Sequence, residues 1–75
     1  MTKDDLFYLI SVKKNYEFTY NGKSYILTYD KIDGKDVILF GRLFETQKFS
    51  SFGEFYNLAK VENHFFREML DIMDL

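Results

Sequence analysis

The chain has 75 residues, enough for one small domain over residues 1–75, and 47% of them are hydrophobic, so it can build a core. It contains no cysteine, which excludes disulfides, cysteine-ligated zinc or iron–sulfur sites and a thiol nucleophile. Ten basic residues stand against twelve acidic ones, and this balance argues against nucleic-acid binding. Because no apolar run approaches the ~18 residues of a membrane helix, and no signal-peptide pattern opens the chain, we expect a cytoplasmic protein without a membrane partner.

The first predicted element is a helix at about residues 3–14. Thr2 is a suitable N-cap, and Asp4 and Asp5 suit the positive end of the helix dipole. An apolar stripe follows at helical spacing: Leu6, Leu9 and Ile10. Asn15, which can adopt a left-handed conformation, is expected to end the helix.

The dipeptides Asn21-Gly22 and Asp33-Gly34 each predict a β-hairpin, because a type I′ turn needs positive φ at both central positions. Counting outward from the turns gives the opposed pairs Tyr20–Lys23, Phe18–Tyr25, Tyr16–Leu27, Lys31–Asp36, Tyr29–Ile38, Leu27–Phe40 and Tyr25–Arg42. The prediction is a three-stranded antiparallel meander with strands at 16–20, 23–30 and 36–44.

The two faces of this predicted sheet differ in composition. One face carries the larger residues, namely Tyr16, Phe18, Tyr25, Leu27, Tyr29, Ile38, Phe40 and Phe44. The other is mixed but partly aliphatic, with Glu17, Thr19, Ser24, Ile26, Thr28, Asp30, Val37, Leu39 and Leu43. We expect the first face to form the core.

After a connection at 47–50, Ser51 and Glu54 have capping-box spacing and predict a helix that begins at Phe52. Its apolar phase falters at 61–63, where Asn63 could cap a separate final helix. The expected fold is therefore α+β: an N-terminal helix, the meander, and one kinked or two short C-terminal helices packed on the aromatic face of the sheet.

No catalytic, metal or cofactor constellation emerges from the sequence. His64 is the only histidine, and Glu62 and Glu68 beside it suggest at most a weak metal site. The spacing of three aspartates at positions 30, 33 and 36 lacks the remaining ligands of a calcium loop. Without a phosphate-binding loop or an activated nucleophile, we expect no enzymatic activity, cofactor or small-molecule substrate.

The stretches Tyr16–Leu27 and Asp33–Phe40, followed by the aromatic helix at 52–60, resemble short uncharacterised bacterial proteins with a YEFxYNGKxYxL strand pair and a DGKxxxxF segment. The resemblance implies a bacterial protein with this fold, and it implies no activity. In size and acidity the chain is also similar to phage-borne inhibitors, some anti-CRISPR proteins among them, although no motif of theirs is present.

Aromatic residues make up 20% of the chain, more than one small core can bury, which favours a protein partner or a homodimer. The predicted interface lies on the final helix or on the mixed sheet face, with Arg42 or Lys48 at its rim, and comprises Phe65, Phe66, Met69, Ile72, Met73, Ile26, Leu39 and Leu43. The expected function is thus a non-catalytic protein-interaction or regulatory module. The alternatives are a phage-type inhibitor and a single-strand nucleic-acid binder that uses exposed aromatic rings.

Overall fold

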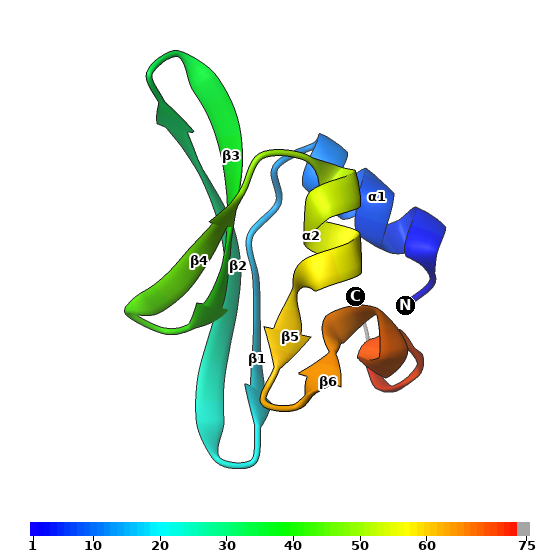
Figure 1. Ribbon diagram of the computed structural model, residues 1–75. Coiled ribbons are helices and arrows are strands. Elements are labelled where there is room, and N and C mark those ends of the chain that lie inside the picture. The colour runs from blue at the N-terminus through cyan, green and yellow to red at the C-terminus, as the bar shows by residue number, and fades with distance from the viewer. Residues whose placement is uncertain (74–75) are drawn as a thin grey trace.

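Four antiparallel strands form the main sheet, and all the helices lie on one side of it (Figure 1). The computed structural model describes residues 1–73; Leu75, which continues the apolar character of the predicted final helix in the sequence, lies outside the described residues. In chain order the elements are α1 (Lys3–Ser11), β1 (Tyr16–Tyr20), β2 (Lys23–Ile32), β3 (Lys35–Arg42), β4 (Glu45–Phe49), α2 (Phe52–Leu58), β5 (Lys60–Val61), β6 (His64–Phe65) and the 3₁₀-helix η1 (Phe66–Ile72). The α+β class and the antiparallel meander are confirmed.

Helix α1 begins where its capping residues predict. The Thr2 hydroxyl accepts a hydrogen bond from the Asp5 N–H, and the Asp5 carboxylate accepts one from the Thr2 N–H, at 3.1 and 3.0 Å. The bond that the Thr2 N–H donates to the carboxylate is the main cause that holds the pKa of Asp5 below its ordinary value. The helix ends at Ser11, earlier than predicted, because Lys13 rather than Asn15 takes the left-handed conformation, with φ of 54°.

Both predicted hairpin turns and both registers are confirmed. Asn21, Gly22, Asp33 and Gly34 all have positive φ, between 52° and 78°, as type I′ turns require. Strands β1 and β2 pair from Tyr20–Lys23 to Tyr16–Leu27, and β2 and β3 pair from Ile32–Lys35 to Tyr25–Arg42.

The predicted number of strands is wrong, since the sheet has the order β1-β2-β3-β4. Strand β3 ends at Arg42, and a two-residue turn, Leu43-Phe44, returns the chain into β4, which includes residues predicted as a connection. Phe44 is 94% exposed at this turn and does not lie on the core face. The strands approach closely at Gly41, where a Cβ atom would lie 2.7 Å from the carbonyl oxygen of Glu45.

The C-terminal third is interrupted around the predicted residues 61–63, but α2 already ends at Leu58 and the interruption is a β-hairpin that was not predicted. Ser51 caps α2 by accepting a hydrogen bond from the Glu54 N–H, whereas the Glu54 carboxylate bonds Ser50 rather than completing a capping box on Ser51. The short strands β5 and β6 then form a tight hairpin in which Glu62 has φ of 57°. Phe65 precedes η1 without a side-chain cap, so the predicted capping role of Asn63 is wrong.

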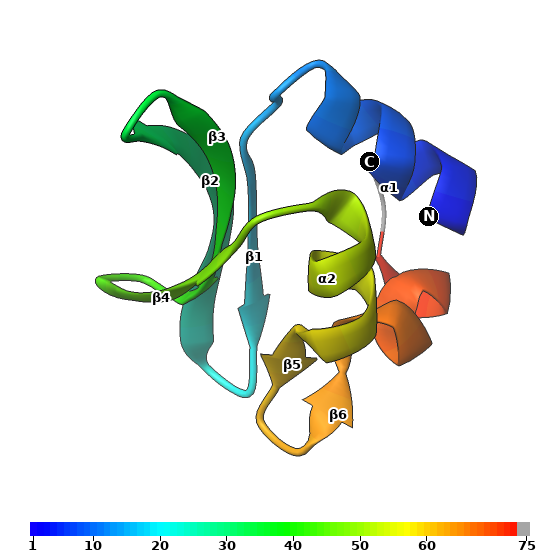
Figure 2. The ribbon, with the colours of Figure 1, turned by 45° about the horizontal axis from the view of Figure 1, so that its top comes forward.

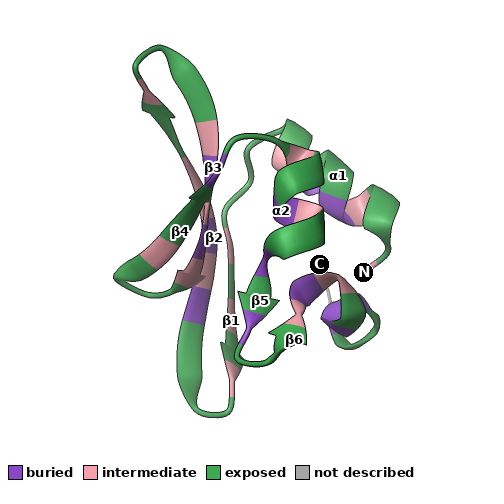
Figure 3. Cartoon of the chain, viewed as in Figure 1, coloured by how far each residue is buried: buried purple, intermediate pink, exposed green. Residues whose placement is uncertain are grey.

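The core lies between the sheet and the helices, as Figure 3 shows by the buried segments on facing elements. At its centre the rings of Phe40, Phe55 and Phe66 contact one another, with centroids 4.8–6.0 Å apart. The Met1 nitrogen donates hydrogen bonds to the carbonyl oxygens of Leu70 and Met73, which ties the start of the chain to η1. The aromatic face is therefore the core face, as predicted.

Candidate functional site

The final helix of the predicted interface is mostly part of the core. Phe66, Met69 and Met73 are buried within the chain, and Ile72 is 70% exposed. Phe65 is half-buried, and its ring lies 4.9 Å from the Lys60 ammonium nitrogen and 4.5 Å from the central guanidinium carbon of Arg67. Burial thus leaves Ile72 as the large exposed apolar side chain of η1.

The other predicted surface, on the sheet, is open. We call the sheet face that points away from the helices the outer face; its apolar side chains are those of Ile26, Val37 and Leu39. No described element packs on it, and both the β2–β3 and the β3–β4 hairpin ends project away from the helical layer (Figure 2). The three side chains are half-buried by their neighbours in the sheet alone. The structure thus places the predicted Ile26 and Leu39 together on one uncovered surface.

The Leu43-Phe44 turn borders this face and was not predicted as a turn. Leu43 is 44% exposed, and Phe44 has φ of 71°, a conformation that bulky side chains rarely adopt. Neither position holds the glycine, asparagine or aspartate that signals a tight hairpin turn, so local sequence gave no indication of it. A large aromatic ring is therefore held in solvent on a strained backbone, which is a common property of binding sites.

Charged residues flank the outer face at opposite edges. Glu17 lies on the edge strand β1 and Lys48 on the edge strand β4, and both are exposed. Within residues 1–73 the ion pairs are Lys13–Asp36 and Lys23–Glu62, so neither Glu17 nor Lys48 is paired. The outer face thus has an apolar centre, one acidic edge and one basic edge.

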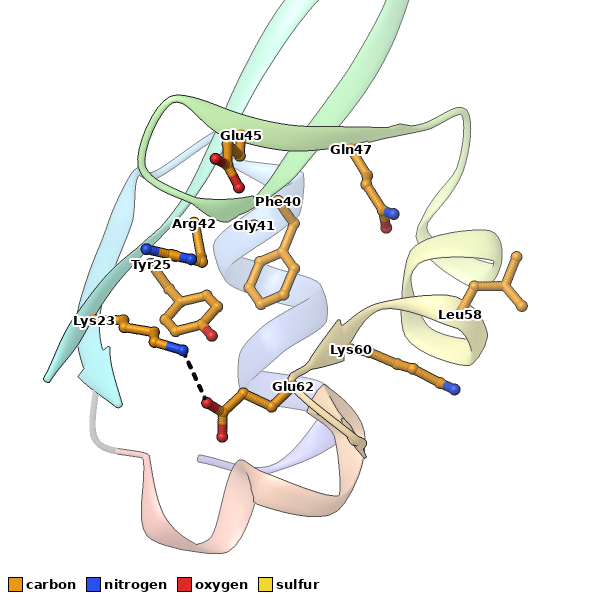
Figure 4. Close-up of a pocket in the computed structure, with 10 residues that line it drawn as sticks. All are labelled: Lys23, Tyr25, Phe40, Gly41, Arg42, Glu45, Gln47, Leu58, Lys60 and Glu62. Carbon is orange, nitrogen blue, oxygen red and sulfur yellow. Dashed lines mark hydrogen bonds and ion pairs between the residues drawn. The ribbon is translucent and has the colours of Figure 1, made fainter. Parts of the chain in front are cut away.

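On the opposite side of the sheet, a groove opens beyond the part that the helices cover (Figure 4). Its volume is about 470 Å³. Its lining comes from three strands of the sheet, from the last residue of α2 and from the β5–β6 hairpin: Lys23, Tyr25, Phe40, Gly41, Arg42, Glu45, Gln47, Leu58, Lys60 and Glu62. The buried rings of Tyr25 and Phe40 line it beside the charged groups.

Some polar side chains of the groove have hydrogen-bond partners within the chain, and others have none among the described residues. The Glu62 carboxylate accepts hydrogen bonds from Lys23, at 3.4 Å, and from Asn21, at 3.1 Å. By contrast, the side chains of Arg42 and Gln47 make no hydrogen bond or ion pair with any residue in 1–73. The groove therefore offers free donors next to apolar surface.

The remaining candidates are accounted for by the fold. Asp33 forms the β2–β3 turn, and Asp36 pairs with Lys13 at 3.0 Å, which lowers the pKa of this carboxyl group. His64 is exposed on β6, and residues 1–73 contain no group of three His, Cys, Asp or Glu side chains that could hold a metal ion. Tyr29 donates hydrogen bonds to the carbonyl oxygens of Lys14 and Leu9, and burial raises its pKa to about 12.

The aromatic rings of the sheet that could imitate a nucleic-acid stacking platform are packed against other residues of the chain. The Phe18 ring stacks between Tyr25, at 5.3 Å, and Phe66, at 5.6 Å. The Tyr16 hydroxyl contacts the Met73 sulfur, and Tyr29 anchors the end of α1. These rings are occupied by contacts within the chain.

No protein-family model, curated protein or solved structure matches this chain. The resemblance to short bacterial proteins therefore stays a prediction. None of the helices formed by residues 1–73 has the length and apolar character needed to cross a bilayer.

Proposed function

We propose that this chain is a non-catalytic protein-interaction module that self-associates through the outer face of its sheet and the adjoining Leu43-Phe44 turn. The observation that carries the proposal is the uncovered row of Ile26, Val37 and Leu39 on the outer face, together with the 94% exposed Phe44 in the turn that ends β3. Scattered apolar side chains on a surface are ordinary, but contiguous exposed apolar groups mark interaction sites, and backbone strain such as that at Phe44 is found most often at functional sites.

The charges at the edges favour a second copy as the occupant. If two outer faces meet about a two-fold axis that runs along the strands, β1 of each copy lies over β4 of the other. Glu17 then faces the Lys48 side of its partner, and the reciprocal pair forms at the opposite edge. Stacked sheets lie about 10 Å apart, a gap that the apolar centre fills and that a flexible lysine can bridge.

The turn strengthens this arrangement. The β3–β4 hairpin end projects away from the helices (Figure 2), and Phe44, which lies in its turn, is exposed and thus available for contact with a neighbouring copy. Burial of an aromatic side chain at an interface compensates for the strain of its backbone. Regulation by association, rather than chemistry, is the function that these features support.

Sedimentation equilibrium of purified protein tests the proposal, with Leu39→Asp and Phe44→Asp as the interface variants. We expect a dimer of the unmodified chain, and a dissociation constant at least ~30-fold higher in each variant, since loss of a central contact costs about 2 kcal/mol or more. Because both side chains lie outside the core, the far-ultraviolet circular dichroism of each variant should remain unchanged.

Two matched variants test the position of the interface. Tyr8→Asp changes an exposed aromatic residue on α1, and Ile72→Asp changes the exposed residue of η1; both should leave the dimer intact. A dimer that is lost with Ile72→Asp but kept with Leu39→Asp would move the interface to η1. A monomer at about 100 μM would contradict self-association.

A further inference from the structure

We propose that the groove beside β4 binds an extended peptide segment of a partner protein, and that this segment carries an acidic side chain. The inference rests on the proposed role of the chain as a protein-interaction module, but it uses a different surface from the outer face. The two sites lie on opposite sides of the sheet, so the chain can bind a partner and a second copy together.

The first observation is that β4 is an open edge strand. Among residues 1–73 it pairs with β3 alone, and Arg42 and Glu45 close the two-residue turn as a hydrogen-bonded pair. Hydrogen-bonded pairs alternate along an antiparallel ladder, so the N–H and C=O groups of Thr46 and Lys48 point to the free edge. Neither residue makes a backbone hydrogen bond to any residue in 1–73 outside the sheet.

The second observation is that the groove lies beside this edge. Glu45 and Gln47, the alternate residues of β4, point their side chains to the groove side, and Leu58 and Lys60 line it from the segment that ends α2 (Figure 4). A peptide strand added to β4 would place every second side chain on that same side of the sheet. The volume of about 470 Å³ next to these residues has room for such side chains.

The third observation is the charge of the lining. Three cations and two carboxylates line the groove, and one of the carboxylates, on Glu62, is already bound by Lys23 and Asn21. Arg42 has no partner within residues 1–73, and its planar guanidinium group suits a carboxylate through two parallel hydrogen bonds. The ligand therefore needs an extended backbone that can pair with the free edge of β4 and a carboxylate that can bind Arg42.

The test uses a library of linear nine-residue peptides of random sequence, selected on the immobilised full chain. We expect enriched peptides to share an acidic residue flanked by alternating apolar positions. Binding of a selected peptide should slow hydrogen exchange at the amides of Thr46 and Lys48. Arg42→Gln should weaken it ~10-fold or more, and the matched change Lys35→Gln at the far end of β3 should not.

N-methylation of alternate backbone nitrogens in the selected peptide removes its donors without changing the protein, and should abolish binding if the peptide adds to β4. The inference is overturned if no peptide is enriched, or if the enriched peptides are insensitive to Arg42→Gln or to N-methylation. Peptides that compete instead with self-association and depend on Leu39 would also overturn it, while leaving the proposed function in place. If the chain binds the peptide at the groove but is strictly monomeric, the peptide site stands and the proposed self-association is wrong.

Discussion

The two faces of the four-stranded sheet differ in burial, and adjacent residues of β3 show this most clearly. Phe40 is 1% exposed and contacts rings from β1, α2 and η1, whereas Leu39, the residue before it, is half-buried on a face that nothing described covers. Alternation along a strand separates the residues that hold the fold from those available to a partner. Apolar character alone therefore does not identify a core position in this chain.

The contrast between Phe40 and Leu39 predicts very different losses of stability when each side chain is shortened to alanine. Phe40→Ala should lower the free energy of unfolding by ~3–5 kcal/mol, since it removes a buried ring and leaves a cavity. Leu39→Ala should change the stability of the monomer by less than about 1 kcal/mol. Urea denaturation of both variants at low protein concentration measures the difference. Equal losses would mean that the two faces are not distinct.

A smaller effect is expected at Tyr29, at the rim of the core face. Tyr29→Phe should cost about 1 kcal/mol near neutral pH, because the hydroxyl loses its bonds to the carbonyl oxygens of Lys14 and Leu9. The folded state raises the pKa of Tyr29 to about 12, above about 10 in the unfolded chain, so its protonated form favours folding. That contribution is complete below pH ~10 and is lost as the pH rises through about 12.

Unfolding free energies measured from pH 9 to 12 check the sign. The unmodified chain should lose stability more steeply than Tyr29→Phe between pH 10 and 12, because only the former has this phenol to ionise. Parallel profiles for the two proteins would show that Tyr29 has an ordinary pKa.

At the Leu43-Phe44 turn, a substitution that stabilises the folded chain should weaken self-association. Phe44→Asn places a residue that tolerates positive φ at this position, and should raise the melting temperature, with a gain of up to about 1 kcal/mol. The same change should weaken self-association. Calorimetry and sedimentation on one preparation compare the two properties, and a variant that loses stability would argue that the Phe44 ring supports the fold.

The smallest expected effect concerns the edges of the outer face. Glu17→Lys or Lys48→Glu alone should raise the dimer dissociation constant a few-fold, since exposed ion pairs contribute about 0.2–1 kcal/mol each. The variant that carries both substitutions should have the original dissociation constant, because its basic edge then faces the acidic edge of the partner again. Sedimentation in low salt measures the cycle. Additive losses in the double variant would contradict the proposed two-fold arrangement.

The sequence predicts those parts of the fold in which the residue types of a turn determine how the neighbouring strands pair. Asn21-Gly22 and Asp33-Gly34 determine both predicted registers, because few residues tolerate positive φ at consecutive positions. Leu43-Phe44 carries no such signal, and β4 lacks an alternating apolar pattern, so the fourth strand was missed. The close approach of the two strands at Gly41 is a backbone contact within the hairpin that the residue types around it do not signal.

The candidate sites also differ in how far local sequence predicts them. Ile26 and Leu39 were predicted from alternation, which the structure preserves on the outer face. Phe66, Met69 and Met73 were assigned to an interface because their segment is apolar on several sides, and a 3₁₀-helix folded against the sheet buries them instead. The groove combines β2, β3, β4, the last residue of α2 and the β5–β6 hairpin, and no local pattern in the sequence indicates such a combination.

The most direct measurement of the central claim is the distance between the outer faces of two copies. The chain has no cysteine, so Ser24→Cys places a single spin label at the end of the outer face, and Tyr8→Cys places one on the helical layer. Double electron–electron resonance should give one short distance for Ser24, on the order of 20–30 Å, since stacked sheets lie about 10 Å apart and each label adds a linker. A clearly longer distance is predicted for Tyr8. Absence of dipolar coupling at position 24, or a shorter distance at position 8, would contradict the account.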